Sequence, residues 1–215
     1  MPAGHGYVGK TTNTERDISG AHLQAEREDM WGEMPGKIVS FDKDKQTATV
    51  QPLYKKRLNG EPTALPELQE VPVRFPRVGG FIMTMPVRAG DRVTLRPQMR
   101  NNEAYHEEDQ EYAANDARSF SLSDYEAFLD GGESLATPIE NFNADRLEIR
   151  SEGSPVKVDM ADDVVRLVND QVRVVARNQY VQLKAGEMHL TIDLVAGQIV
   201  SSHPIVLGPD PHPED

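Results

Sequence analysis

Five consecutive rows of eight residues decide the fold of the C-terminal part of the chain: PVKVDMAD (155–162), DVVRLVND (163–170), QVRVVARN (171–178), QYVQLKAG (179–186) and EMHLTIDL (187–194). The second position of each row is apolar or aromatic, and the eighth is Asp, Asn or Gly in the first four rows. Asp, Asn and Gly favour turns, whereas the β-branched residues between them favour strands. Each row therefore predicts one short strand and one turn, in a repetitive β structure.

Such short strands cannot cover their own apolar residues, because a strand of about six residues spans only ~20 Å. We expect three identical chains to intertwine around one axis as a narrow β-prism or β-helix, with each chain giving a strand to each face. The alternative is a two-sheet sandwich with hairpins. Two features argue against hairpins. The turns lack Asn-Gly and Asp-Gly pairs, and the inward positions shift from Val158 and Met160 in one row to Val165 and Leu167 in the next, as in a twisting shaft.

The region before residue 100 has the pattern of a small β barrel. Five strands are predicted at Gly36–Asp42, Gln46–Leu53, Leu68–Phe75, Gly80–Met85 and Asp91–Gln98. The segments between them carry turn residues, such as Asn59-Gly60 and Ala89-Gly90-Asp91. Five short strands in this space predict a Greek-key barrel of the oligonucleotide/oligosaccharide-binding (OB) type.

Negative charge is concentrated in one segment. The chain carries a net charge of −12, and residues 101–144 hold eleven Asp and Glu residues against one base, Arg118. This balance argues against a general nucleic-acid binder, which presents Lys and Arg to phosphates. We expect the segment to be a solvated connector. Within it Leu122, Tyr125, Phe128 and Leu129 are spaced as on a short helix.

The expected organisation has five parts: an arm with a short helix (1–34, the helix over Ala21–Trp31), the OB-fold barrel (35–100), the acidic connector (101–144), a triple-stranded β-helix shaft (145–202) and a tip (203–215). No stretch approaches the ~20 apolar residues of a membrane helix, and no signal peptide is expected. The fold class is thus all-β.

Three stretches resemble the central spike proteins of contractile phage tails. PGKIVSFDKDKQTATVQP (35–52) and LPELQEVPVRFPRVGGFIMTMPVRAGDRVTL (65–95) look like the N-terminal barrel of these spikes. VPVRFPRVGGF followed by MPVRAGDRV is the most specific part, and RSFSLSDYEAF (118–128) resembles the short Ser-Asp element that follows the barrel. The resemblance covers about residues 35–130.

The resemblance implies a homotrimer at the centre of the tail baseplate of the virion, assembled in the host cytoplasm. Its needle would pierce the host outer membrane during contraction. The implied partners are other baseplate hub proteins, tail tube proteins and, transiently, the host outer membrane, with no nucleic acid. Whether a separate tip protein caps the needle is left open.

A metal site is the one site expectation. In many such spikes a His-x-His pair from each of three chains binds iron at the tip. Here no His-x-His occurs, and His203 and His212 are nine residues apart. A lone His203 on a threefold axis would still supply three nitrogens to Fe or another transition metal. The alternative is a plain surface or tip-packing histidine. His189 should point away from Met188 and Leu190, and so outward.

No enzyme is expected, because the sequence lacks the common catalytic motifs. Gly4–Thr11 formally matches a phosphate-binding loop, but no strand precedes it and no apolar helix follows. The alternative function is an OB-fold binding module for single-stranded nucleic acid or glycan. It would use Lys55, Lys56 and Arg57 beside Tyr54, a basic and aromatic cluster of the kind that stacks bases.

Overall fold

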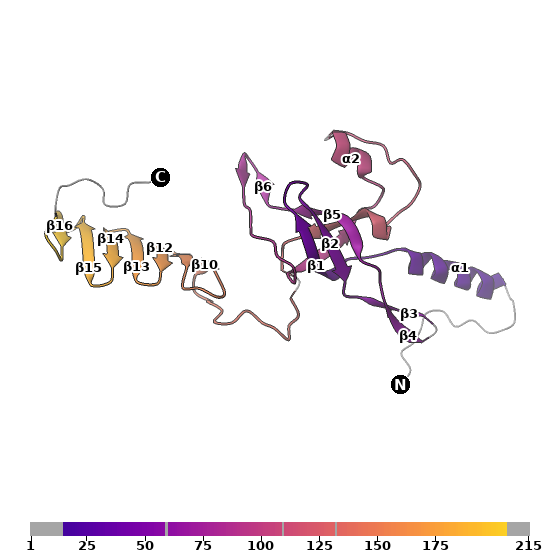
Figure 1. Cartoon of the computed structure of the whole chain (residues 1–215), viewed down its shortest axis with the longest axis horizontal. Coiled ribbons are helices and arrows are strands. Elements are labelled where there is room, and N and C mark those ends of the chain that lie inside the picture. Colours follow the sequence, from indigo (N-terminus) through magenta and orange to yellow (C-terminus); the bar gives the residue numbers. More distant parts are fainter. Residues whose placement is uncertain (1–14, 59, 109, 132, 206–215) are drawn as a thin grey trace. The chain divides into compact units, whose positions relative to one another are not determined.

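The structure is a computed structural model that describes residues 15–58, 60–108, 110–131 and 133–205 (Figure 1). The chain divides into two compact units, Met1–Pro138 and Ile139–Asp215. The Gly4–Thr11 motif and His212 lie outside the described residues, as do most of the expected tip and the first part of the expected arm. Among the helices described, none has the length and apolar character needed to cross a membrane.

The first unit contains a closed barrel of five strands. Around the barrel the order is β1 (Met34–Asp42), β2 (Thr47–Pro52), β5 (Leu68–Arg74), β9 (Tyr125–Phe128) and β8 (Arg92–Pro97). Neighbouring strands are antiparallel except β5 and β9, which are parallel. Burial alternates along β1, β2 and β8, so one side of each strand fills the interior. The predicted five-stranded barrel is confirmed.

Branched aliphatic side chains pack the barrel interior. Ile38, Val50, Val93 and Leu95 are at most 1% exposed, and burial of each contributes about 1.5–3 kcal/mol. Gly36 lies where β1 approaches its neighbours most closely, since a Cβ there would come within 2.7 Å of Val50 Cγ1. Only glycine fits at this position without displacing the core.

The fifth barrel strand differs from the one predicted. Gly80–Met85 does not enter the barrel: β7 (Phe81–Ile82) pairs only with β6 (Arg77–Val78). The fifth strand of the barrel is β9 instead, in the stretch for which the sequence predicted a helix. The helical structure found there is the short 3-10 turn η1 (Leu122–Asp124), just before β9. Tyr125 and Ala127 are buried at strand spacing, while Leu122 and Leu129 pack against the core from the two ends of β9. Helical spacing of the four apolar residues was therefore misleading.

Part of the acidic segment is fixed to the barrel by its single arginine. Arg118 donates through Nε and Nη2 to the two carboxylate oxygens of buried Asp124, at 2.8 and 2.9 Å, and through Nη2 to Glu103 at 3.1 Å. The hydrogen bond with Asp124 is the main cause that raises the pKa of Arg118 above its usual value. Glu103 begins the short helix α2 (Glu103–Glu108), so this helix is tied to the residue just before β9.

A buried carboxylate on β9 makes a second attachment. Glu126 accepts hydrogen bonds from Arg74 on β5 and from Asn102 Nδ2 at 3.2 Å, and His106 Nε2 on α2 lies 3.4 Å away. The hydrogen bond with Glu126 raises the pKa of Arg74. The acidic segment is therefore only partly a solvated connector.

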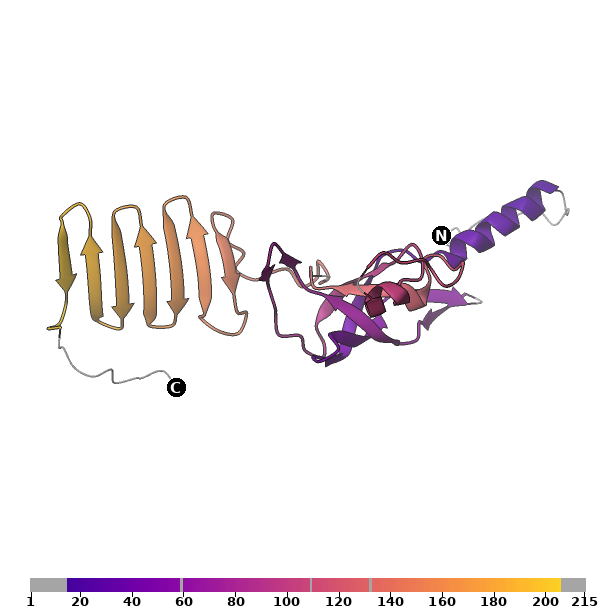
Figure 2. The ribbon, with the colours of Figure 1, turned by 90° about the horizontal axis from the view of Figure 1, so that it is seen from above.

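The second unit is a single sheet of seven strands in chain order (Figure 2). The strands are β10 (Leu147–Arg150), β11 (Lys157–Ala161), β12 (Val164–Asn169), β13 (Val172–Arg177), β14 (Tyr180–Ala185), β15 (Met188–Asp193) and β16 (Gln198–Ser201), and every neighbouring pair is antiparallel. β12 to β15 each begin at the second position of a row of eight. The prediction of one strand and one turn per row is confirmed.

The argument against hairpins was wrong. Asn169 pairs with Val172 and Ala185 with Met188, so two-residue turns join these strands. Asp170 and Gly186 supply the left-handed backbone that such turns need, with φ of 48° and 56°. A two-residue turn also explains why the inward residues shift from one row to the next. Across such a turn the fourth residue of one row pairs with the fifth residue of the next, as Val158 does with Leu167. Successive strands of one chain thus complete one sheet, instead of each chain giving single strands to several faces.

The remaining elements lie in the first unit. Helix α1 (Glu15–Asp29) begins before the predicted Ala21–Trp31 helix and ends before Trp31. β3 (Lys55–Leu58) and β4 (Glu61–Ala64) form a separate hairpin. Tyr125 Oη donates to the carbonyl of Gly32 at 2.6 Å, and Trp31 N donates to Phe120 O at 3.1 Å. These bonds fix the chain between α1 and β1 to the barrel.

The first prediction concerns this tyrosine and alkaline pH. Burial raises the pKa of Tyr125 to about 12, above the ~10 of a free phenol. As the pH rises, Tyr125 therefore loses its phenol proton in the unfolded chain before it does so in the folded protein. The contribution of Tyr125 to the free energy of unfolding is full below about pH 10 and declines toward pH 12. Tyr125→Phe should lower the free energy of unfolding by about 1 kcal/mol at neutral pH, and the difference between the two proteins should shrink above pH 10. Urea unfolding at a series of pH values measures both effects.

Tyr54→Phe is the matched control, because Tyr54 is 50% exposed. It should match the wild type at every pH. Parallel pH profiles for wild type and Tyr125→Phe would contradict the account of Tyr125.

Candidate functional site

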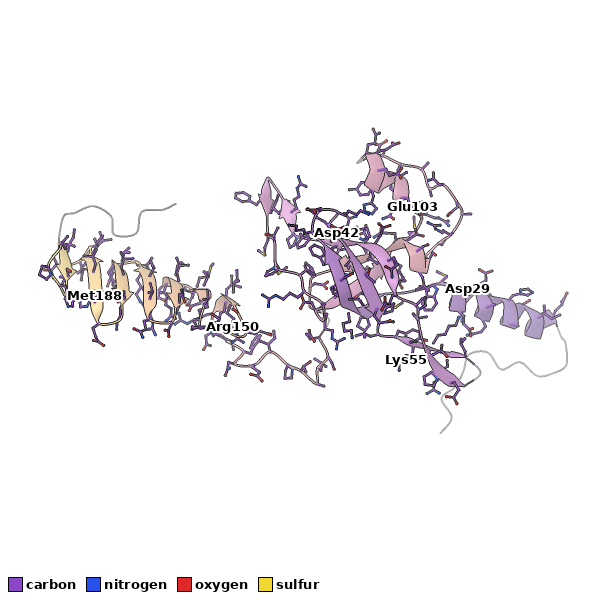
Figure 3. The ribbon with its side chains drawn as sticks, in the orientation of Figure 1. Asp29, Asp42, Lys55, Glu103, Arg150 and Met188 are labelled. Carbon is purple, nitrogen blue, oxygen red and sulfur yellow. The ribbon has the colours of Figure 1, made fainter. Side chains whose placement is uncertain are left out.

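The two faces of the C-terminal sheet differ sharply in chemistry. Directly paired residues of neighbouring strands share a face, and successive residues of a strand alternate between faces. The register therefore assigns one set to the same side, here called the apolar face: Leu147, Ile149, Val158, Met160, Val165, Leu167, Val172, Val174, Ala176, Val181, Leu183, Ala185, Met188, Leu190, Ile192 and Ile199. Only Asn169 and Ser201 interrupt it within the paired residues. Arg150 and Met188, labelled in Figure 3, mark the first and sixth strands of this sheet.

The described residues of the second unit leave this face uncovered. Eleven of its side chains are between 41% and 64% exposed: Leu147, Ile149, Met160, Val165, Leu167, Val172, Val181, Leu183, Met188, Ile192 and Ile199. In the described part of the second unit only Asp159 and Val164 are buried, and both lie on the opposite side. Completing the burial of eleven such side chains is worth on the order of 10 kcal/mol per chain. An apolar patch of this extent marks an interaction surface.

The sequence assigned the faces correctly. Val172 and Val174 lie on the apolar face, and Arg173 lies on the other side, called here the polar face. His189 pairs directly with Lys184 and so belongs to the polar face, opposite Met188 and Leu190, as predicted. That the valines surround a threefold axis stays a prediction.

The second prediction tests which face is covered. Val174→Asp places a charge in the middle of the apolar face, and an unpaired charge in a dry interface costs several kcal/mol. We expect soluble oligomer to be lost in size-exclusion chromatography. Arg173→Asp, one residue earlier on the polar face, should assemble like the wild type. Equal tolerance of both changes would contradict a covered apolar face.

The candidate metal ligand lies just after β16. His203 is exposed, and its Nδ1 is 3.0 Å from Ser202 Oγ, which leaves Nε2 free to coordinate. The described residues contain no group of three or more His, Cys, Asp or Glu side chains placed to hold a metal ion. His189 lines the same hollow as His203, but two imidazoles are fewer than such a group, so the expected ion would draw on His203 from further copies.

The third prediction follows from that requirement. Elemental analysis of protein purified without a metal-affinity tag should find about one transition metal ion per three chains. His203→Ala should abolish it and His212→Ala should retain it. The prediction of a metal site would be contradicted if the protein contains no metal and His203→Ala leaves its thermal stability unchanged.

A basic and aromatic cluster lies between the end of α1 and the β3–β4 hairpin, where Lys55 is labelled in Figure 3. The rings of Trp31 and Tyr54 meet edge to face at 6.4 Å, and Lys56 Nζ lies 5.6 Å from the centre of the Trp31 ring. These residues, with Lys55 and Arg57, line one hollow. The sequence identified the bases and Tyr54 but missed Trp31, which reaches the cluster from a different segment.

One comparison with known proteins gives a match, and that match covers the barrel strands. Residues 34–131 match the family model described as the phage protein Gp138 N-terminal domain. The match begins with β1 and ends just after β9, within one residue of the region that resembles phage spikes at each end, and it spans less than half of the chain. It indicates a phage protein, and it suggests a structural role in the virion. No curated protein matches the chain.

Proposed function

We propose that this protein is the central spike of the baseplate of a contractile phage tail, a structural and non-enzymatic trimer that pierces the host outer membrane. The observation that carries the proposal is the apolar face, which the described part of the second unit leaves uncovered. The phage family match of the barrel supports it from the other unit. The expected partners are baseplate hub and tail tube proteins and, transiently, the outer membrane.

Simple geometry favours three copies. Sheets that pack face to face lie ~10 Å apart, so each sheet fills about 5 Å in front of it. A triangular prism with sides of about 20 Å, the length of a six-residue strand, has its axis about 6 Å from each face. Three sheets therefore fill the interior, whereas four would leave the axis about 10 Å from each face and the centre empty. Two sheets packed face to face would also cover the apolar face, as in a sandwich, and the mass of the particle distinguishes that arrangement from three sheets.

The row nearest the axis would then be the middle of each strand. Val158, Leu167, Val174, Leu183 and Leu190 are directly paired and occupy this row. All five are branched aliphatic residues of the kind that fill the centre of small closed β structures. Each chain supplies one whole face of this prism.

Such a shaft suits a mechanical role. Its strands run across the axis, so the hydrogen bonds between strands run along it and resist an axial load. Seven strands at ~4.8 Å spacing span about 29 Å, close to the ~30 Å hydrocarbon core of a bilayer. The sides of the prism have no free sheet edges, which limits unwanted pairing with other chains.

The fourth prediction is the mass of the particle in solution. Light scattering should give about three times the 23.9 kDa of one chain, because closed threefold assembly covers every apolar face. A shortened chain that ends at Ala144 should lose most of that association. A full-length monomer at micromolar concentration, or a shortened chain that stays fully trimeric, would contradict the proposal.

The second candidate is a binding module for single-stranded nucleic acid or glycan. It is favoured by the Trp31, Tyr54 and Lys56 cluster, because aromatic faces beside cations stack bases and sugars. It ranks second because it leaves the apolar face unexplained. Oligonucleotide binding that disappears in Trp31→Ala would support it.

A further inference from the structure

The polar face of the C-terminal sheet carries a cluster of cations in a chain with a net charge of −12. A hollow on this face is lined by four of them, Lys157, Arg166, Arg173 and Arg177, and by one carboxylate, Asp159. The cations come from three neighbouring strands, β11, β12 and β13. The hollow is therefore a local centre of positive charge.

The carboxylate in the hollow is already fully engaged. Asp159 is buried, and it accepts from Arg166 Nε at 2.8 Å and from Arg146 Nη1 at 3.5 Å, with Lys157 Nζ at 3.6 Å. Lys157 also bonds Glu148 at 2.6 Å. Arg150 Nε lies 3.5 Å from Glu148 as well. Two carboxylates here thus share four cations, so the acids do not neutralise the surface.

Arg173 in the hollow and Lys184 beside it have no acidic partner among the described residues. Arg173 and Lys184 are directly paired across β13 and β14, and His189 follows Lys184 in the same row on β15. Among the described residues, Arg173 and Lys184 make no ion pair and no side-chain hydrogen bond, whereas Arg177 is paired with Asp163. Like charges directly opposite one another destabilise a sheet, and a bound anion between them would remove that repulsion.

We propose that this hollow and the adjoining row bind the phosphate groups of an anionic lipid surface. Arg173 offers a planar fork of donors that fits phosphate oxygens. Val168, Val175 and Tyr180 also line the hollow. The row from Arg173 through Lys184 lies in the plane of a sheet, so several cations can meet several headgroups of a planar surface at once. Because the polar face is opposite the apolar face, this site does not depend on how many copies cover the latter.

The experiment is co-sedimentation of the full-length protein with vesicles at low salt. Vesicles of phosphatidylcholine mixed with phosphatidylglycerol should bind the protein, and vesicles of phosphatidylcholine alone should not. The double variant Arg173→Gln, Lys184→Gln should bind the anionic vesicles roughly thirtyfold more weakly, since each base near an anionic membrane contributes about a fivefold increase. Both residues lack side-chain partners in the sheet, so the variant should keep the mass of the wild type.

The matched control is Lys37→Gln, Lys43→Gln, which removes the same charge from two exposed positions of the other unit. It should bind like the wild type. An equal loss in both variants, or equal binding to both kinds of vesicle, would overturn the proposal. Binding of inorganic phosphate or of single-stranded DNA without vesicle binding would also overturn it, because either result would assign the cations to another ligand.

Discussion

The C-terminal sheet has one layer, and none of the described residues of its own unit covers its apolar face. A folded sheet becomes stable when its apolar face is packed against another layer. The barrel meets this requirement internally, with Ile38, Val50 and Leu95 almost completely buried. The second unit buries only Val164 among its described apolar residues. This difference makes the second unit dependent on association, and it is the reason to regard the protein as an assembled structural component.

The charges are arranged to support that association. The polar face gathers its buried carboxylate, Asp159, with Arg146 and Arg166, so charged groups are paired on the side that faces away from the apolar face. In the first unit, Arg118 pairs with buried Asp124 just before β9, and Arg74 pairs with buried Glu126 on β9. Two acids of the strongly acidic segment therefore form specific ion pairs that fix the segment at β9.

Much of the fold could be predicted because it depends on local patterns. Four barrel strands and the rows of eight could be predicted from alternating apolar and polar residues and from turn residues. The faces of Val172, Arg173 and His189 could be predicted because successive side chains of a strand point to opposite faces. The fifth barrel strand could not be predicted, because β9 pairs with β5 and β8 over long sequence separations and its neighbours share helical spacing. The hairpins were missed because Asp170 adopts a left-handed conformation without a following glycine. Trp31 was missed at the basic cluster because contact with Tyr54 depends on tertiary structure.

The most direct test of a covered apolar face uses the absence of cysteine from the sequence. A single cysteine at Leu183 lies on the apolar face, and one at Lys184 lies on the polar face of the same strand. In an isolated chain both positions are exposed, so both thiols would react quickly with a water-soluble reagent. If the apolar face is covered, the thiol at position 183 should react slowly in the assembled protein and the thiol at position 184 should react fast. Equally fast reaction at both positions would contradict it.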